Sequence, residues 1–419
     1  MFPALYNIVL RVAQRLLPVA TPFNAKIRTW TEGRVDWADR LKNQLAGNTN
    51  PVVWFHAASL GEFEQGRPVI EAFRTEYPTH KILLTFFSPS GYDVRKNYEG
   101  ADYITYLPAD TPANARQFIT LVKPQIAFFI KYEFWYNYLH ELKAAQVPVI
   151  LFSAIFRPSQ LFFKPYGPVS TFYRSMLSTF DCILVQNQES VDLLRGIGMN
   201  RVILAGDTRF DRVSQTAAAR KDISIAQIFK AGQPLLVVGS AWPEDMAVLI
   251  LFLNAFEEPL KAIIAPHEIH EEEIKYWRKQ LIKPSTRFSQ TNETDVSQAD
   301  ILFIDNVGML SSLYQYGEFA FIGGAFKQGL HNILEAATFG MPLFFGPDYD
   351  KFQEAIDLVN EGAAFPVGTV TELSTAFVEH YADPGKAAQI SRDYVLRNIG
   401  ATAKVMEVVK NFAHWNKTA

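Results

Sequence analysis

The feature that most constrains this chain's fold is a series of short runs that are apolar from end to end. In the first half these runs are VVWFHA (52–57), KILLTF (81–86), YITYLP (103–108), IAFFIK (126–131), VPVILFSA (147–154), CILVQN (182–187) and RVILAG (201–206). Helical stretches separate them. Strands without a polar side are buried on both faces, which is typical of parallel sheets covered by helices. The pattern therefore predicts a doubly wound α/β domain.

A second series of apolar runs follows a polar, helical stretch near residues 213–232. Its members are LLVVGS (235–240), KAIIAP (261–266), ILFID (301–305), FAFIGG (319–324) and PLFFG (342–346). A chain of 419 residues is long enough for two domains that each bury a core. We therefore predict two Rossmann-like domains facing each other across a cleft, with ligands at the carboxyl ends of the strands.

The two series divide the chain into four predicted segments. An N-terminal amphipathic helix occupies residues 1–24, and the first Rossmann-like domain occupies residues 25–210. The second domain covers residues 211–395, and a closing helix covers residues 396–419.

The N-terminal segment is apolar but carries a narrow polar stripe of Asn7, Arg11, Gln14, Arg15 and Pro18, spaced three and four residues apart. Two arginines in the middle of the stretch argue against a membrane span. The first 50 residues contain seven Lys or Arg and three acidic residues. An apolar face beside arginines predicts a helix lying on an anionic membrane surface. The alternative is a helix that packs on its own N-terminal domain.

Composition excludes several other classes of protein. A net charge of -3 lacks the basic excess of nucleic-acid-binding proteins, so no nucleic acid partner is expected. The single cysteine, Cys182, allows no intrachain disulfide and no cysteine-rich zinc site. The chain therefore fits a reducing, cytoplasmic setting.

The first motif, HAASLGEFEQGRP (56–68), follows the first predicted strand and begins a helix. Small residues, including Ser59 and Gly61, permit close approach of a ligand, and Glu62 sits at the helix start. Local sequence alone favours a carboxylate that stabilises the helix dipole. The functional interpretation is a general base at the mouth of the cleft. Glu64 would face elsewhere on the helix and is the weaker candidate.

The second motif, IKYEFWYN (130–137), also follows a buried strand. Lys131, Glu133 and Trp135 place a cation, an anion and an aromatic ring in one turn, as in carbohydrate or phosphate sites. The alternative is an aromatic cluster capped by a structural Lys–Glu pair.

The third and most specific motif is FIGGAFKQGLHNILEAATFGMPLFFGP (321–347). Gly323 and Gly324 let a loop fold around phosphate oxygens, and a helix beginning near Asn332 would present free N–H groups. Glu335 is placed to accept hydrogen bonds from ribose hydroxyls. This pattern is typical of a nucleotide-sugar site, and its late position disfavours a dinucleotide oxidoreductase.

Two further motifs follow strands of the second half. In GSAWPED (239–245), Gly239 and Ser240 suit a phosphate or close backbone approach. In APHEIH (265–270), Pro266 and His267 are expected to flank the nucleotide base. The motif lacks ordered metal-ligand spacing and a third ligand, so no metal site is predicted.

Residues 156–174, FRPSQLFFKPYGPVSTFYR, combine aromatic side chains with Arg157, Lys164 and Arg174. Apolar groups with cationic neighbours suit a phosphorylated lipid or a membrane surface. The alternative is a buried phenylalanine cluster under a long loop.

Nine motifs together carry a resemblance to a known family. They are HAASLGEFEQGRP, TFFSPSGY, YLPADTP, KYEFWYN, LVQNQES, LAGDTRFDRV, GSAWPED, APHEIH and HNILEAATFGMP. Their order and spacing resemble those of the 3-deoxy-D-manno-octulosonic acid (Kdo) transferases. The resemblance implies a GT-B fold, in which the last helix commonly crosses back to the first domain. It also implies an inverting enzyme without metal or cofactor, at the cytoplasmic face of the bacterial inner membrane.

The resemblance further implies substrates and residue roles. The donor would be CMP-Kdo and the acceptor the lipid A precursor, a tetraacylated disaccharide bisphosphate. Glu62 falls on the glutamate of the family's SxGE motif, the base that deprotonates the acceptor hydroxyl. Glu133 falls on an essential acceptor-side or structural glutamate, and Asn332 and Glu335 fall on the nucleotide side. Arg157 is the candidate substitute for an arginine that many members carry nearby.

Two alternatives remain at this stage. One is another GT-B glycosyltransferase or an epimerase that uses a UDP-sugar. The choice of sugar donor distinguishes this alternative from a Kdo transferase. The other is a non-catalytic carbohydrate- or lipid-binding scaffold, which would show no transfer.

Overall fold

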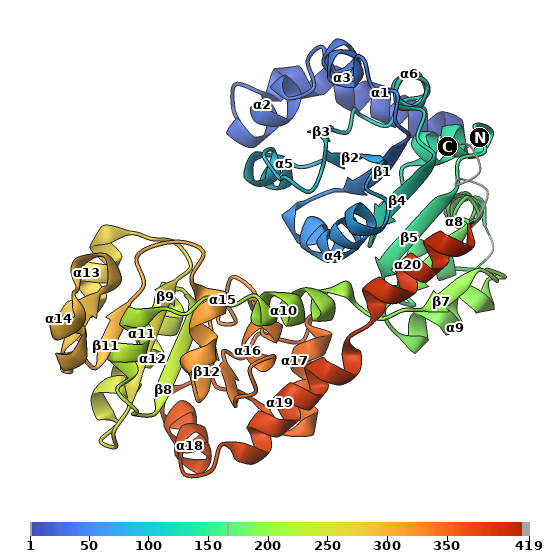
Figure 1. Cartoon of the computed structure of the whole chain (residues 1–419). Coiled ribbons are helices and arrows are strands. Elements are labelled where there is room, and N and C mark those ends of the chain that lie inside the picture. The colour runs from blue at the N-terminus through green and yellow to red at the C-terminus, as the bar shows by residue number, and fades with distance from the viewer. Residues whose placement is uncertain (1, 166, 413–419) are drawn as a thin grey trace. The chain divides into compact units, whose positions relative to one another are not determined.

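The computed structural model describes residues 2–165 and 167–412, and within them the chain forms two compact units. The first unit comprises Met1–Arg212 and Ile399–Ala419, and the second comprises Val213–Asn398. Each unit is built on a seven-stranded sheet whose strands all run parallel (Figure 1). The prediction of two Rossmann-like domains is confirmed.

The first sheet has the strand order β3-β2-β1-β4-β5-β6-β7. Its strands are β1 (Val52–Ala57), β2 (Lys81–Phe86), β3 (Tyr103–Tyr106), β4 (Ile126–Ile130), β5 (Val149–Ala154), β6 (Cys182–Val185) and β7 (Val202–Leu204). All seven coincide with the apolar runs of the sequence. Burial on both faces explains this agreement, because each strand had to be apolar throughout.

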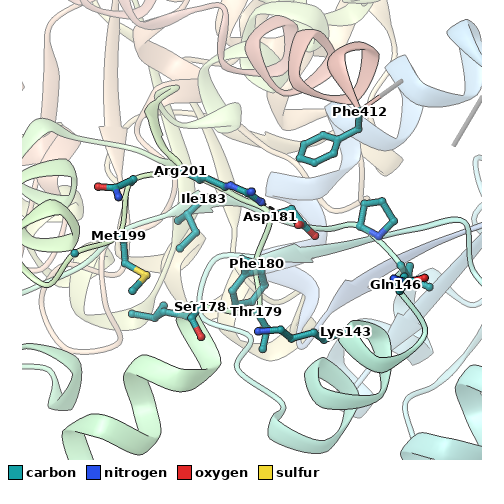
Figure 2. Close-up of a pocket in the computed structure, with 15 residues that line it drawn as sticks. Lys143, Gln146, Ser178, Thr179, Phe180, Asp181, Ile183, Met199, Arg201 and Phe412 are labelled. Carbon is teal, nitrogen blue, oxygen red and sulfur yellow. Dashed lines mark hydrogen bonds and ion pairs between the residues drawn. The ribbon is translucent and has the colours of Figure 1, made fainter. Parts of the chain in front are cut away.

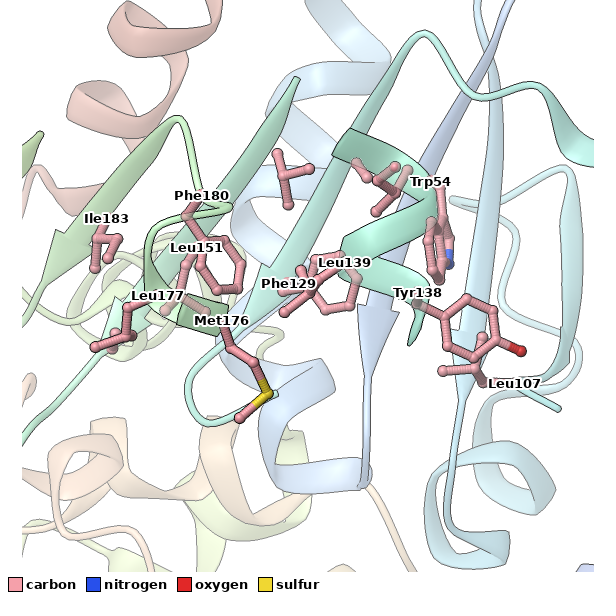
Figure 3. Close-up of a cluster of buried hydrophobic side chains, with 14 of the residues drawn as sticks. Trp54, Leu107, Phe129, Tyr138, Leu139, Leu151, Met176, Leu177, Phe180 and Ile183 are labelled. Carbon is pink, nitrogen blue, oxygen red and sulfur yellow. The ribbon is translucent and has the colours of Figure 1, made fainter. Parts of the chain in front are cut away.

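Alternate side chains of each strand enter different cores, one on each face of the sheet. In β1, Trp54 joins the cluster shown in Figure 3, where it packs on Phe129 and Tyr138 with ring centroids 5.2 and 5.7 Å apart. The next residue, Phe55, points to the opposite core and stacks on Phe128 at 4.4 Å. Both cores are continuous across the sheet.

Helices cover both faces of this first sheet. They are α1 (Phe2–Ala20), α2 (Ala25–Glu32), α3 (Trp37–Leu45), α4 (Leu60–Glu76), α5 (Pro89–Arg95), α6 (Pro112–Val122), α7 (Tyr136–Ala144), η1 (Leu161–Phe163), α8 (Pro168–Leu177), α9 (Gln188–Gly196) and α20 (Ala401–Asn411). Local sequence sets several of their ends. In α6, for example, the Thr111 side chain caps the helix before Pro112, and Lys123 ends it in the left-handed region.

The last described helix, α20, belongs to the first unit and packs on α4 (Figure 1). Asp211 caps its N-terminus by accepting hydrogen bonds from the Gly400 N–H at 2.7 Å and from the Thr402 N–H and hydroxyl at 2.7 and 2.8 Å. The second aspartate of the LAGDTRFDRV motif therefore holds the returning helix. Residues 413–419 of the predicted closing helix lie outside the described residues.

The second sheet has the order β10-β11-β9-β8-β12-β13-β14. Its strands are β8 (Leu235–Ala241), β9 (Lys261–Pro266), β10 (Ser285–Arg287), β11 (Ile301–Phe303), β12 (Phe319–Ile322), β13 (Leu343–Phe345) and β14 (Ala364–Pro366). The five inner strands were predicted, whereas β10 and β14 were missed. Both are three-residue edge strands, and edge strands need no long apolar run.

The helices of the second unit include α10 (Thr208–Ala218), which contains the division between the units. The others are α11 (Ser224–Lys230), α12 (Pro243–Ala255), α13 (Glu271–Gln280), η2 (Phe288–Gln290), α14 (Glu293–Gln298), α15 (Leu310–Leu313), η3 (Tyr314–Tyr316), α16 (Leu334–Ala337), α17 (Gln353–Glu361), α18 (Val370–Tyr381) and α19 (Gly385–Asn398). On one face of the sheet, α12, α13 and α18 enclose an apolar core with the strands.

The strand order reverses once in each sheet, and these switch points are where open α/β sheets bind ligands. In the first sheet the flanking strands are β1 and β4, and in the second they are β8 and β12. The loops after these four strands carry the HAASLGE, KYEFW, GSAW and GGAFKQGLHN motifs. The topology therefore brings the predicted motifs together in pairs, one pair in each unit.

The N-terminal helix α1 packs on its own unit through one face. The Tyr6 hydroxyl donates to Asp110 Oδ2 at 2.6 Å, and the Tyr6 ring contacts Tyr136 with centroids 5.8 Å apart. Asn7 accepts a hydrogen bond from Asn137 Nδ2 at 2.8 Å. The alternative interpretation, packing on the N-terminal domain, therefore describes this face.

The remaining surface of α1 is apolar and exposed. Leu5, Ile8, Val9, Val12 and Leu16 are each at least half accessible to solvent. The predicted polar stripe is split by this arrangement, because Asn7 and Gln14 turn toward the domain while Arg11 and Arg15 stay exposed. Met1 and the side chain of Pro18 lie outside the described residues. Among the helices of the described part, none is both long and apolar enough to cross a bilayer.

Candidate functional site

The loop between β1 and α4 carries Glu62 in the first turn of the helix. The Ser59 hydroxyl donates to Glu62 Oε2, and Ser59 caps the helix through its backbone. The half-buried Glu62 carboxylate is thus restrained by its own motif. The neighbouring loop after β2 is bonded to the same segment, since the Ser88 N–H donates to the Ala58 carbonyl at 2.7 Å.

Glu133 lies in the loop after β4, and it is 7% exposed. Its Oε2 accepts hydrogen bonds from Trp135 Nε1 at 2.6 Å and from the ring of His56 at 3.1 Å. His56 comes from β1, so this bond joins the two strands that flank the switch point. A buried carboxylate held by two donors is fixed in orientation.

The other residues of the KYEFW motif serve this arrangement. Lys131 follows β4 with φ +67°, a left-handed conformation that a lysine rarely adopts and that stores strain. Its ammonium lies over the Tyr132 ring at 5.3 Å, so the Lys–Glu pair of the alternative interpretation is wrong. Trp135 packs on Phe87 with centroids 4.5 Å apart, and its N–H is used by Glu133.

The Tyr132 phenol is partly buried and is surrounded by charged side chains. Its pKa is raised, chiefly by burial, and the charges of Arg157, Glu62, Arg209 and Asp207 act on it as smaller causes. These four groups come from three segments of the first unit: Arg157 follows β5, Glu62 lies at the start of α4, and Asp207 and Arg209 follow β7. Glu62 and Arg157, two residues singled out by the sequence, therefore lie around one phenol.

Asp207 and Arg209 were not predicted as site residues. Arg209 donates to both carboxylate oxygens of buried Asp207, from its backbone N–H at 2.9 Å and its Nε at 2.8 Å. Gln65 also faces this carboxylate, at 3.4 Å. The signal was present in the LAGDTRFDRV motif, which follows β7 at the same edge of the sheet.

Glu64 has a structural role. It forms ion pairs with Arg95 at 2.6 Å and Arg212 at 3.9 Å. Its charge is therefore compensated on the side of α4 that faces α5 and α10. This leaves Glu62 as the carboxylate of the motif with no cationic partner among the described residues.

In the second unit, the glycines of the predicted donor site make close internal contacts. A Cβ on Gly239 would lie 2.0 Å from the Tyr314 hydroxyl, and a Cβ on Gly323 would lie 2.2 Å from the Ser240 carbonyl oxygen. Ser240 adopts φ +55° at a bulge in β8, which turns its backbone toward the glycine loop. A larger residue at Gly323 would displace backbone, and one at Gly239 would displace the Tyr314 phenol.

The glycine loop closes on itself. The N–H groups of Lys327, Gln328 and Gly329 all donate to the Gly324 carbonyl, at 3.2, 3.0 and 2.8 Å. Gly324 (φ +95°) and Gly329 (φ +103°) both need the left-handed region. The predicted helix beginning near Asn332 is corrected to the single turn α16, because Asn332 Oδ1 accepts the Leu334 N–H at 3.2 Å and precedes the helix.

Glu335 lies in this single turn, where its Oε1 accepts a hydrogen bond from Asn332 Nδ2 at 3.3 Å. The two residues that the resemblance places on the nucleotide side are therefore in direct contact. A one-turn helix, however, has only a small dipole, so the expected helix N-terminus for phosphate is absent at this position.

Asp245 fastens the glycine loop to the loop after β8. Its Oδ2 accepts from the Trp242 N–H at 2.8 Å and the Gly324 N–H at 2.9 Å. Burial raises the pKa of the carboxyl to about 6. Asp245 Oδ1 is buried and has no hydrogen-bond partner among the described residues.

Three aromatic rings meet beside this loop. His267 stacks on Trp242 with centroids 4.3 Å apart and contacts His331 at 4.5 Å. His331 Nε2 accepts the Trp242 Nε1–H at 3.0 Å, so its other nitrogen carries the proton. Burial, and then His267, lower the pKa of His331 to about 4, and the ring is neutral at physiological pH. Pro266 ends β9 directly before His267.

His267, Glu268 and His270 do not gather as ligands. His270 and Glu268 pair with each other at 2.8 Å on the surface. In the part of the chain that the structure describes, no three His, Cys, Asp or Glu side chains are placed to hold a metal ion.

Segment 156–174 is mostly a buried aromatic cluster. Phe156, Phe162 and Phe172 are buried, and Arg174 donates to the Phe162 carbonyl at 2.8 Å. The alternative interpretation holds for these side chains, so Arg174 is a structural residue. Arg157 stays exposed, and Tyr166 lies outside the described residues.

A cavity of about 700 Å³ lies at the end of the first sheet where the strands begin (Figure 2). Gln146, Asp181 and Arg201, which precede β5, β6 and β7, are among its lining residues, as is Phe412. Because the strands are parallel, this is the edge opposite to the loops that carry Glu62 and Glu133. The cavity is therefore separate from the candidate site.

The fold has known counterparts. A UDP-GlcNAc 2-epimerase from Neisseria meningitidis, solved with UDP-GlcNAc bound, aligns with a TM-score of 0.61 and 16% sequence identity, over 86% of this chain and 100% of that chain. A putative UDP-N-acetylglucosamine 2-epimerase from Listeria monocytogenes aligns with a TM-score of 0.57 and 12% identity, over 88% and 98% of the two chains. Together with one switch point in each of the two parallel sheets, this likeness defines a GT-B-type fold.

Sequence relatives narrow the class to a family. A 3-deoxy-D-manno-octulosonic acid transferase from Aquifex aeolicus is 30% identical over 341 residues, which cover 79% of this chain and 86% of that protein. One from Haemophilus influenzae is 24% identical over 87% of this chain and 88% of that protein. Residues 35–212 match the family model for 3-deoxy-D-manno-octulosonic-acid transferase (kdotransferase). The chain belongs to this family of glycosyltransferases.

Proposed function

We propose that this enzyme transfers Kdo from CMP-Kdo to the lipid A precursor, tetraacyldisaccharide 1,4'-bisphosphate, in lipopolysaccharide core biosynthesis. The first unit would bind the acceptor through Ser59, Gly61, Lys131, Trp135 and Arg157. The second would bind the donor nucleotide through the loops after β8, β9 and β12. The observation that supports this assignment best is the placement of Glu62 after switch strand β1, restrained by Ser59.

In the proposed reaction, Glu62 accepts the proton of an acceptor hydroxyl while that oxygen attacks the anomeric carbon of Kdo. The bond from this carbon to the CMP phosphate breaks on the opposite side, so the configuration inverts. CMP leaves with the bonding electrons, and its growing charge requires nearby donors. A general base contributes about 10²- to 10⁴-fold to such a step. No metal or cofactor is needed in this scheme.

The test of Glu62 uses Glu64 as a matched control on the same helix turn. Glu62→Gln should lower kcat by about 10²- to 10⁴-fold with purified protein, CMP-Kdo and lipid acceptor. Glu64→Gln should keep kcat near wild type, since Glu64 is engaged by Arg95 and Arg212. Near-wild-type transfer by Glu62→Gln would remove Glu62 as the base.

Donor choice separates this proposal from the UDP-sugar alternative, which the fold neighbours share. Mass spectrometry of the lipid product should show addition of Kdo from CMP-Kdo. Turnover of UDP-sugars without turnover of CMP-Kdo would contradict the proposal, and no turnover of either donor would favour a scaffold.

We also propose that the exposed face of α1 lies on the cytoplasmic surface of the inner membrane as a peripheral or monotopic contact. Its apolar stripe is bordered by Arg11 and Arg15, the arrangement that suits an anionic leaflet. Leu161 and Val169, which are 44% and 38% exposed, would form a second contact near α8.

Deleting α1 is a poor test of this contact, because Tyr6 and Asn7 of the helix bind the domain. Val9→Ser with Val12→Ser interrupts the middle of the apolar stripe and leaves both contacts in place. Sedimentation with anionic lipid vesicles should show weaker binding by the double variant. Equal binding would contradict the membrane role of this face.

A further inference from the structure

A chain of hydrogen bonds crosses the first sheet just below the candidate site. Trp54 Nε1 donates to Thr85 Oγ1 at 2.8 Å, and Thr85 Oγ1 lies 2.8 Å from His56 Nδ1. His56 Nε2 lies 3.1 Å from Glu133 Oε2, which also accepts the Trp135 Nε1–H at 2.6 Å. The chain connects β2, β1 and the loop after β4.

The polar residues of this hydrogen-bond series lie in strands that are otherwise apolar. His56 in VVWFHA and Thr85 in KILLTF are both 0% exposed. A buried polar group destabilises the folded state unless it is paired. Each of these side chains is paired. Glu133 is the carboxylate at one end of the hydrogen-bond series. The arrangement therefore serves the carboxylate.

The donors along the chain can be assigned in one direction. Trp135 and His56 both face Oε2 of Glu133, and an ionised carboxylate only accepts, so His56 Nε2 must carry a hydrogen. Thr85 already accepts from Trp54, and its own hydrogen reaches His56 Nδ1 at 2.8 Å, closer than the Phe55 carbonyl at 3.4 Å. This leaves His56 as the neutral Nε2–H tautomer.

We propose that His56 is a positioning residue for Glu133: Thr85 holds the ring by Nδ1, and Nε2–H fixes Oε2 so that Oε1 faces the acceptor. Glu133 Oε1 has no hydrogen-bond donor among the described residues. A carboxylate held in this way presents one acceptor oxygen in a fixed direction. Its chemical complement is a hydroxyl of the acceptor sugar.

This inference rests on the proposed function, because it assigns the acceptor side of the same site. It adds a residue that contacts neither substrate and acts through Glu133. The expected effect of losing the His56–Glu133 bond is a fall on the order of 10- to 100-fold, the range for a hydrogen bond to a buried charged group.

Two amide substitutions separate the two ring nitrogens. The side-chain nitrogen of glutamine lies as many bonds from Cα as His Nε2, and that of asparagine lies as many bonds as Nδ1. His56→Gln should therefore still donate to Glu133 and keep activity near wild type. His56→Asn can bond to Thr85 but stops short of Glu133. It should lower kcat/KM for the lipid acceptor on the order of 10- to 100-fold.

The KM for CMP-Kdo should stay unchanged in both variants, since the nucleotide loops lie in the other unit. A merely structural role for His56 would affect the two variants alike. Equal loss in His56→Gln and His56→Asn would overturn the proposal, and so would wild-type kcat/KM in His56→Asn.

A second measurement does not depend on enzymatic activity. In protein labelled with ¹⁵N-histidine, the His56 ring should show a protonated Nε2 and a bare Nδ1. The assignment would come from the resonance that disappears in His56→Gln. A bare Nε2 would overturn the positioning role. If wild-type protein transfers no Kdo, the proposed function fails, while this measurement still decides the orientation of the ring.

Discussion

The contact between α1 and Asp110 makes a quantitative prediction. The Tyr6 hydroxyl donates to Asp110 Oδ2 at 2.6 Å, and the Asn137 and Tyr138 N–H groups donate to the same carboxylate at 3.1 and 3.0 Å. Asp110 is 1% exposed. Tyr6→Phe removes one donor and keeps the ring that packs on Tyr136 and Phe172.

A hydrogen bond to a charged group contributes about 1.5–3 kcal/mol to the free energy of unfolding. For a domain of this size, each kcal/mol shifts the midpoint by about 2–4 °C. The unfolding midpoint of the first unit in Tyr6→Phe should therefore fall by roughly 3–12 °C at pH 8. Thermal unfolding followed by tryptophan fluorescence measures it, and Tyr276→Phe on the surface is the matched control.

The loss of stability in Tyr6→Phe should depend on pH in a definite direction. Burial raises the pKa of Asp110 to about 6, and the Tyr6 hydrogen bond opposes that rise. Removing the bond raises the pKa further, so the variant holds its proton to higher pH. The difference in stability is fully present above both pKa values, and it disappears as the pH falls from the higher pKa of the variant through about 6. An equal midpoint at pH 8, or an undiminished difference at pH 5, would refute this account.

Three further predictions follow from single contacts. Asp211→Ala removes the cap of α20 and should cost about 0.5–2 kcal/mol, seen as faster amide hydrogen exchange in that helix; unchanged exchange would contradict it. Gly239→Ala places a Cβ against the Tyr314 hydroxyl and should destabilise the second unit by about 1–3 kcal/mol in urea unfolding, whereas an unchanged midpoint would show that the phenol can move. The ring of His331 should titrate near pH 4 by NMR, because burial lowers its pKa; a midpoint near 6.5 would mean that the ring is exposed.

Much of the fold was predictable because its strands are buried on both faces. The twelve apolar runs of the sequence all became strands, since a doubly covered sheet demands apolar residues at every position. The edge strands β10 and β14 escaped prediction, because their outer sides make no such demand. The length of α16 was overestimated, because Asn332 accepts a hydrogen bond from the Leu334 N–H and the helix begins only after it.

The candidate site was predictable only in part. Glu62 and Glu133 stood out because each follows a buried strand within a motif of small or aromatic residues. His56 and Thr85 were missed, although a polar residue inside an apolar strand is a visible signal of a paired group. Asp207 and Asp245 were missed as well, because Gln65 and Gly324, which contact them, are distant in sequence. Arg209 was missed although its partner Asp207 lies two residues away.

By itself, the sequence determined the class of fold, the order of the strands along the chain and the family, because each depends on local patterns or on similarity along the chain. The tertiary structure alone decided which residues meet. It turned Tyr6 and Asn7 of an apolar helix toward Asp110 and Asn137, and it joined His56 to a glutamate 77 positions away. Burial requires that polar groups form hydrogen bonds. Strand order and register decide which groups can meet, and a local sequence pattern contains neither.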